Sequence, residues 1–166
     1  VNMGPNKLNT LRTLINVAPK LDYEYRTFTG TRFLDHAVAN EDSDPDVVRL
    51  VLEKLKSSYD SKTFTSLVNY QRKSTTLKWK SIYFIAKSLQ RTGVVESGLM
   101  ASLAIDAGTT PLNLAVVRGD VEIVKLLLEA GADPYVENDL GMNAFEICEK
   151  CGPFPTVMKV LQKNSE

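Results

Sequence analysis

The stretch GTTPLNLAVVRGDVEIVKLLLEAGADP, residues Gly108–Pro134, predicts a helix, a tight turn and a second helix. Thr109, Thr110 and Pro111 start the first helix, because a hydroxyl group caps free amides and proline fits the first helical turn. Gly119 ends this helix and Asp120 starts the second one, which carries a broad apolar stripe. A helix pair this apolar cannot bury both of its faces alone. We therefore expect similar units to pack on each side of it.

Composition predicts one globular domain over residues 1–166. The chain is 43% hydrophobic and carries no formal net charge, so no overall field favours nucleic acid or a membrane. No apolar run approaches the roughly 18 residues that a membrane span needs. Two cysteines are too few for a disulfide framework, which favours a reducing, cytoplasmic setting, with the nucleus left open. We expect no signal peptide, and the start at Val1 indicates a piece of a longer protein.

Helical patterns continue on both sides of the opening stretch. They cover residues 6–17, 31–40, 41–55, 75–90, 141–152 and 153–162. Asp44 and Pro45 are expected to cap the helix of the third segment. In the fourth segment, the side chains expected to be buried are Trp79, Ile82, Tyr83, Ile85, Ala86 and Leu89. Residues 57–67 fit no periodicity and are predicted to form an inserted loop, with at most a helical turn.

Glycines recur at a fixed step along the chain. Gly108 and Gly141 are 33 residues apart, and so are Gly98 and Gly131. With GTTPLNLA and VEIVKLLLEAGADP, this spacing resembles the ankyrin repeat family, whose unit is a turn followed by two antiparallel helices. The resemblance implies an all-α, ankyrin-type solenoid of stacked helix-turn-helix repeats. Its units would be a partial repeat 6–22, a repeat 30–58, the loop 57–67, a degenerate repeat 68–98, a repeat 108–131 and a terminal repeat 141–163.

The chain departs from the family at one position of the motif. Where the family has histidine in its T-P-L-H tetrapeptide, the four units carry Asp35, Lys80, Asn113 and Glu146. Asp35 and Asn113 can replace part of the hydrogen bonding of that histidine, whereas lysine is a poor substitute. We therefore expect the unit with Lys80 to be distorted, and its two helices can merge into one long helix.

No residue pattern predicts catalysis, a metal site or a cofactor. Cys148 and Cys151 form a C-x-x-C pair, but a second pair is missing and the single histidine, His36, is far away in sequence. Cys148 takes the place of a core alanine in the repeat, so burial is expected there, while Cys151 one turn on is expected to be oxidisable. The chain has no phosphate-binding glycine loop and no hydrolase motif. We therefore expect a protein that is not an enzyme.

Charge is segregated along the chain although it balances overall. Residues 61–95 contain seven basic side chains and no acidic one, whereas residues 120–149 contain eight acidic side chains and only Lys125 as a base. The simpler interpretation is a set of solvated helix faces. The functional interpretation is a bipolar surface that orients a partner or docks on a neighbouring domain.

The resemblance implies a non-catalytic protein-interaction module that binds a partner protein through a concave face of turn tips and first helices. Spacing in the family motif places the partner-binding positions at Arg26, Phe28, Asn40, Gln71, Lys73, Asp106, Thr109, Arg118, Glu137, Asp139, Met142 and Lys150. One alternative is a structural spacer that packs against other domains of its own host chain. A second is a binder of an acidic ligand, nucleic acid or anionic lipid, through basic segment 61–95. Nucleic acid is disfavoured because no recognition motif accompanies the basic residues.

Overall fold

The computed structural model describes residues 9, 13, 22–39, 44–92 and 105–164, and every extended regular element among them is a helix. The predicted all-α class is confirmed. The helices are α2 (Phe33–Ala39), α3 (Pro45–Ser58), α4 (Ser61–Val68), α5 (Leu77–Thr92), α7 (Pro111–Arg118), α8 (Val121–Glu129), α9 (Ala144–Cys151) and α10 (Pro155–Lys163). The predicted helix over 6–17 and the partial repeat 6–22 lie outside the described residues, apart from isolated positions.

The α7–α8 pair has the start and stop signals expected from its sequence. The Thr110 side chain accepts a hydrogen bond from the Asn113 N–H, and Pro111 occupies the first turn. Gly119 ends α7 with φ 69°, in the left-handed region that favours glycine. The Asp120 side chain then accepts from the Ile123 N–H and starts α8. The start of both helices and the end of α7 are therefore fixed by local chemistry.

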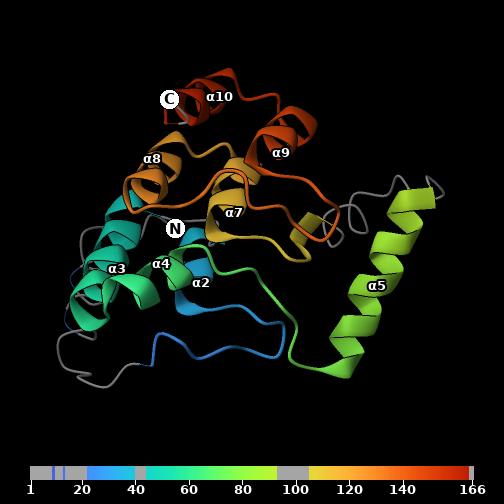
Figure 1. Ribbon diagram of the computed structural model, residues 1–166, viewed down its shortest axis with the longest axis horizontal. Coiled ribbons are helices and arrows are strands. Elements are labelled where there is room, and N and C mark those ends of the chain that lie inside the picture. Colours follow the sequence, from blue (N-terminus) through green and yellow to red (C-terminus); the bar gives the residue numbers. More distant parts are fainter. Residues whose placement is uncertain (1–8, 10–12, 14–21, 40–43, 93–104, 165–166) are drawn as a thin grey trace.

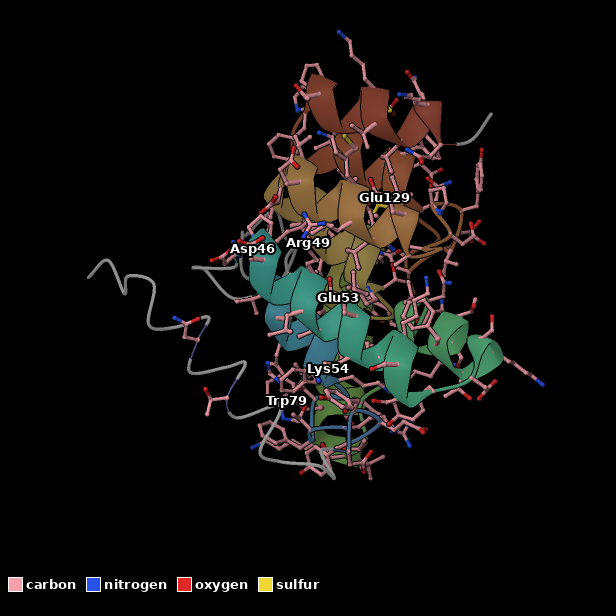
Figure 2. The ribbon with its side chains drawn as sticks, turned by 90° about the vertical axis from the view of Figure 1, so that its left-hand side faces the viewer. Asp46, Arg49, Glu53, Lys54, Trp79 and Glu129 are labelled. Atoms are coloured by element: carbon pink, nitrogen blue, oxygen red, sulfur yellow. The ribbon has the colours of Figure 1, made fainter. Side chains whose placement is uncertain are left out.

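Three helix pairs stack to form the body of the molecule. Helices α2, α7 and α9 form an inner layer, and α3, α8 and α10 form an outer layer (Figure 1). Figure 2 views the outer layer face-on, with α3 below α8. The stack buries one continuous apolar core, which includes Val38, Val116, Leu127, Ile147 and Leu161, each 0% exposed. This is the predicted stacking of helix-turn-helix units.

The order of the stack differs from the predicted one. Helix α2 packs directly on α7, and α3 packs directly on α8. The described part of residues 68–98 therefore supplies no layer between the first and the central pair, although a degenerate repeat is predicted there. These residues form a connecting segment and α5, which lies apart from both layers (Figure 1).

Residues 57–67 also differ from their prediction, because α3 extends to Ser58 and α4 begins at Ser61 in place of an inserted loop. The Asp60 side chain accepts hydrogen bonds from Lys62 and Thr63, which caps α4. These bonds, from Thr63 above all, hold the pKa of Asp60 below its ordinary value. Serine and threonine weaken the helical signal of this segment. Burial of α4's end against the core supplies what local propensity lacks.

Helix α5 is a single 16-residue helix that belongs to no layer of the stack, so it is not the distorted repeat unit that the spacing predicts. Tyr83 and Ala86 are buried as predicted, but Ile85 is 52% exposed. The prediction for Ile85 is wrong because α5 is covered on a narrower face than a repeat helix would be. None of the helices that the structure describes is long and apolar enough to cross a bilayer.

Candidate partner-binding surface

Three turns, which we call fingers, precede the inner helices and share one backbone hydrogen bond. In the first finger the Thr27 N–H donates to the Thr31 carbonyl, and in the third the Asn138 N–H donates to the Met142 carbonyl. In the second finger the same bond joins the Arg72 N–H to the Thr109 carbonyl at 2.9 Å. The two arms of the second finger are therefore separated by residues 73–108, and α5 is an insertion in the tip of this finger.

Helix α5 contacts all three fingers at equivalent positions, each three residues before the residue whose carbonyl accepts the bond of that finger. The rings of Trp79 and Phe28 lie 6.1 Å apart between centroids, and the Tyr83 hydroxyl donates to Asp106 at 3.2 Å. The Lys87 ammonium lies 2.8 Å from the Asp139 carboxylate. The α5 side chains in these contacts are four residues apart, so they lie on one face of the helix. One helix face therefore lies across the fingers of the first, second and third repeats.

A buried ion pair closes the base of the insertion. The Arg72 guanidinium precedes α5 and binds the carboxylate of Asp106, which follows it. The Arg72 side chain is 8% exposed, whereas that of Asp106 is 25% exposed. Burial, followed by the neighbouring Asp106 charge, raises the pKa of Tyr83. The ends of an insertion of more than 30 residues are thus held together by this charge pair as well as by the backbone bond from Arg72 to Thr109.

Asp35 lies close enough to this pair to interact with its charges, and it is 0% exposed. Its Oδ2 accepts the Arg32 N–H at 2.8 Å, while no described residue donates to Oδ1. Burial raises the pKa of Asp35 to about 6, against the smaller opposing effects of the Arg32 N–H and the Arg72 and Arg32 guanidinium groups. The Arg32 guanidinium stacks over the Tyr70 ring at 3.9 Å. This buried cluster joins the first repeat to the second finger.

Asp35, Asn113 and Glu146 are each the third residue of an inner helix, the position of the family's histidine. The Asn113 Nδ2 donates to the Val136 carbonyl at 3.4 Å, and Glu146 accepts the Asn143 N–H at 2.8 Å. Asn113 therefore makes part of the hydrogen bonding expected of it, whereas Asp35, like Glu146, accepts an N–H from a residue just before its own helix. Lys80, predicted at the same position, belongs to α5 and to no inner helix.

The exposed ends of the inner helices form a second surface. Ala39, Val117 and Lys150 are each the seventh residue of α2, α7 and α9, and each is exposed. Arg118 follows Val117, and its Nη1 donates to the Ala39 carbonyl at 3.2 Å. Because α7 packs between α2 and α9, these equivalent positions follow one another across the stack. We call Ala39, Val117, Arg118 and Lys150 the inner ridge.

Apart from Thr109, the predicted binding residues divide into three groups. The first group is exposed and takes no part in the contacts of α5 with the fingers: Arg26, Lys73, Arg118, Glu137 and Lys150. Those that contact α5 are Phe28, Asp106 and Asp139. Gln71 is half-buried and donates to the Glu137 carbonyl at 2.7 Å, Met142 is half-buried against the core, and Asn40 lies outside the described residues.

Thr109 contradicts its prediction as a contact residue. It is 1% exposed, and its hydroxyl donates to the Ile105 carbonyl at 3.1 Å. Sequence reasoning also missed Val117, which precedes Arg118 on the inner ridge and is 36% exposed. An apolar residue in the last turn of an inner helix was the available signal.

The cysteines and His36 form no site together. Among the described residues no three histidine, cysteine or acidic side chains lie close enough to hold a metal ion. Cys148 is 1% exposed, in agreement with its expected place in the core. Cys151 is half-buried, and this burial raises the pKa of its thiol, which lowers the fraction of reactive thiolate. This disfavours the expected ready oxidation of Cys151.

A shallow groove of about 230 Å³ lies on the outer layer between α3, α4 and α8. Its apolar lining is Leu52, Phe64, Leu126 and Ala130, and its charged lining is Arg49, Glu53, Lys56 and Glu129. Figure 2 places Arg49 and Glu53 on α3, facing the viewer, with Glu129 above them on α8. The volume is below the range of roughly 300–1,000 Å³ typical of small-molecule sites, and both charge signs line the groove. Neither property favours a particular ligand.

Comparison with known protein families identifies the central helix pair of the stack. The family model described as "Ankyrin repeat" matches residues 107–139. The chain is 39% identical over 54 residues to the E3 ubiquitin-protein ligase KEG of Arabidopsis thaliana, a match that covers 32% of this chain and 3% of that protein. It is 36% identical over 90 residues to the palmitoyltransferase AKR1 of Candida albicans, a match that covers 52% of this chain and 10% of that protein.

The family match falls on the finger, α7, α8 and the following turn, which are the elements with the clearest local signals. The predicted resemblance to the ankyrin repeat family is confirmed. An ankyrin repeat indicates a protein-interaction module, and the chain spans only a small part of the relatives that it matches. Residues 107–139 are thus an ankyrin repeat, and the structure stacks the helices of this repeat between two further helix pairs.

Proposed function

We propose that this chain is a non-catalytic module that binds a partner protein through the inner ridge. The observation that carries the proposal is the exposure of Ala39, Val117 and Lys150 at equivalent positions of three adjacent helices. The apolar residues around them are committed to stacking, so these ends are what the inner layer offers to a partner. We place the module in the cytoplasm of the cell, as its two free cysteines suggest.

The arrangement on the inner ridge suits recognition of a protein. Val117 supplies an apolar centre that is 36% exposed, and Arg118 and Lys150 supply positive charge beside it. Apolar contact at the centre with charge at the rim is the usual composition of a protein interface. Helix α5 covers part of the finger tips, so a partner would reach the inner ridge more readily than the fingers.

Charge and shape substitutions on the ridge test the proposal. A partner protein captured with the chain is titrated against Val117→Asp and Lys150→Glu by calorimetry, with Arg49→Glu on the outer layer as the matched control. We expect Val117→Asp to weaken binding by about tenfold or more, as substitutions at interface centres do. Arg49→Glu should leave affinity unchanged. If Arg49→Glu weakens binding and Val117→Asp does not, the interface lies on the outer layer and the proposal is wrong.

The structural-spacer alternative rests on the contact of α5 with all three fingers, since an intramolecular helix already occupies surface that a partner could use. In that case the isolated chain binds no separate protein, and Val117→Asp changes only the stability of the longer host. The short coverage of the relatives is compatible with a host of this kind.

A further inference from the structure

Helix α5 carries large apolar side chains on its solvent face as well as aromatic ones on the face toward the fingers. Leu77 is 80% exposed, Phe84 67% and Ile85 52%. These three side chains fall within about 100° of the helix circumference, given 100° per residue. The opposite face holds Trp79 and Tyr83, which contact the fingers. Exposed side chains of this size therefore lie together on one outer face, which we call the α5 outer face.

The charge around this face has one sign. Lys78 and Lys80 are exposed and flank the apolar residues, and residues 61–95 contain no acidic side chain. The two acidic groups that α5 contacts are neutralised, because Asp139 pairs with Lys87 and Asp106 pairs with Arg72. The acidic side chains of Asp22 and Glu24 interact with Tyr59, which ends α3 in the stack and is not part of α5. The α5 outer face is therefore apolar with a positive border.

We propose that the α5 outer face docks on the surface of an anionic lipid bilayer. Leu77, Phe84 and Ile85 would enter the boundary between headgroups and acyl chains, while Lys78 and Lys80 stay at the level of the phosphates. Anionic lipid attracts each lysine near the surface, and apolar burial adds to this attraction. The position of α5 outside both layers leaves this face accessible to a flat surface (Figure 1).

The spacing of the apolar residues favours a bilayer over a protein groove. A helix that binds in a groove uses apolar anchors at positions i, i+3 or i+4, and i+7. Leu77 and Phe84 have the i, i+7 spacing, but Lys80 and Ser81 occupy the positions between them. The apolar residues are therefore spread over the helix surface without a line of deep anchors, which suits a helix that lies in the plane of the membrane interface. Phe84 is the single ring of this face on which a base could stack, whereas Leu77 and Ile85 offer a nucleic acid neither a ring nor a charge.

The experiment measures binding of the whole chain to vesicles. Vesicles of phosphatidylcholine with about 30% phosphatidylserine are compared with pure phosphatidylcholine by co-sedimentation, at low and at near-physiological salt. We expect binding to the anionic vesicles that weakens with salt. Leu77→Ser/Phe84→Ser should reduce affinity by about tenfold or more, and Lys78→Glu/Lys80→Glu should abolish the preference for anionic lipid.

Two controls make the outcome decisive. Lys159→Glu/Lys163→Glu reverses two exposed lysines on α10 and should leave vesicle binding unchanged. Circular dichroism verifies that every variant keeps its helices. Absence of binding to anionic vesicles, or an equal loss in the α10 variant, overturns the proposal. Vesicle binding that is unchanged in Leu77→Ser/Phe84→Ser also overturns it. So does a single-stranded oligonucleotide that binds the chain more tightly than the vesicles do, with the same affinity for the parent and for this variant.

Discussion

At the scale of single residues, Asp35 is the side chain most at odds with its surroundings. It is fully buried, yet its pKa is only raised to about 6, so it is charged at neutral pH. A carboxylate that is taken out of water without full compensation destabilises the fold. Because the folded state holds the Asp35 proton more tightly than the unfolded state, this contribution favours folding below pH 3.8 and is lost as pH rises to about 6.

Asp35→Asn removes this charge and supplies the amide that Asn113 has at the equivalent position. We expect the variant to be more stable than the parent at neutral pH by about 2–3 kcal/mol, which is the linkage energy of the shift in pKa. The fall in the free energy of unfolding between about pH 4 and pH 6 should become flatter. Urea unfolding across this range measures both effects, with the exposed carboxylate in Glu53→Gln as control. A parent whose stability rises with pH in this window, or a destabilised variant, contradicts the account.

Leu127 is the residue-scale test of the core. It is 0% exposed in α8, between the first and third helix pairs of the stack. Leu127→Ala should lower the free energy of unfolding by roughly 2–5 kcal/mol, through lost apolar burial and the cavity left behind. Leu77→Ala, at a leucine 80% exposed, should change it by less than about 0.5 kcal/mol. Equal shifts in thermal midpoint for the two variants would show that Leu127 is not a core residue.

At the scale of elements, the insertion is joined to the stack by polar contacts more than by apolar ones. Arg72 at one end of the insertion binds Asp106 at the other, and it also interacts with the charge of Asp35. One guanidinium therefore compensates two carboxylates in a largely buried place. The loss of this group should affect the stability of the stack as well as the position of α5.

We expect Arg72→Met to lower the free energy of unfolding by about 2–4 kcal/mol. This is slightly less than for breaking a fully buried pair, because the Asp106 side chain is 25% exposed. The cost should be smaller in an Asp35→Asn background, where one of the two charges no longer needs compensation. A double-mutant cycle by urea unfolding measures this coupling. Additive effects of the two substitutions would mean that Arg72 does not stabilise Asp35.

Two glycines with similar backbones separate the cost of conformation from the cost of contact. Gly119 has φ 69° and an added Cβ would lie 2.7 Å from the Phe154 ring, whereas Gly131 has φ 90° and no atom within 4 Å of such a Cβ. Gly131→Ala should cost about 1 kcal/mol from the left-handed backbone alone. Gly119→Ala should cost more, because the Phe154 ring before α10 must also move. Equal costs in thermal unfolding would argue against this contact.

At the scale of the whole molecule, the described part of the chain is a stack of three helix pairs, with α4 packed beside α3 and α5 outside the stack. The stack owes its cohesion to adjacent pairs, α2–α3 with α7–α8 and α7–α8 with α9–α10. Helix α5 is attached through side chains on finger tips. Elements with fewer buried apolar contacts open at lower free energy.

Hydrogen exchange followed by mass spectrometry tests this division. Amides of α7 and α8 should be the most protected, because both helices have neighbours on each side in the stack. Amides of α5 should exchange earlier, through openings that leave the stack folded. Equal protection in α5 and α7 would indicate that the insertion unfolds only with the rest of the chain.

The sequence by itself determined the units of the fold and their ends. Thr110, Pro111, Gly119 and Asp120 act through bonds to their nearest neighbours in the chain, so their roles can be predicted without knowledge of the rest. The same holds for Asp44, which caps α3 as expected. Of the residues predicted to bind a partner, Arg118 and Lys150 are exposed in the last turns of the inner helices, as the proposed role requires.

Only the tertiary structure decided how the units are ordered, because adjacency in the stack depends on contacts between residues far apart in sequence. Spacing alone made residues 68–98 a repeat, yet the bond from Arg72 to Thr109 makes residues 73–92, the described part that includes α5, an insertion in one finger. The same contacts turned Ile85 outward, buried Thr109 and brought α5 against Phe28, Asp106 and Asp139. A periodic pattern tells which face of a helix is apolar, but whether that face is covered depends on which neighbour the folded chain places beside it.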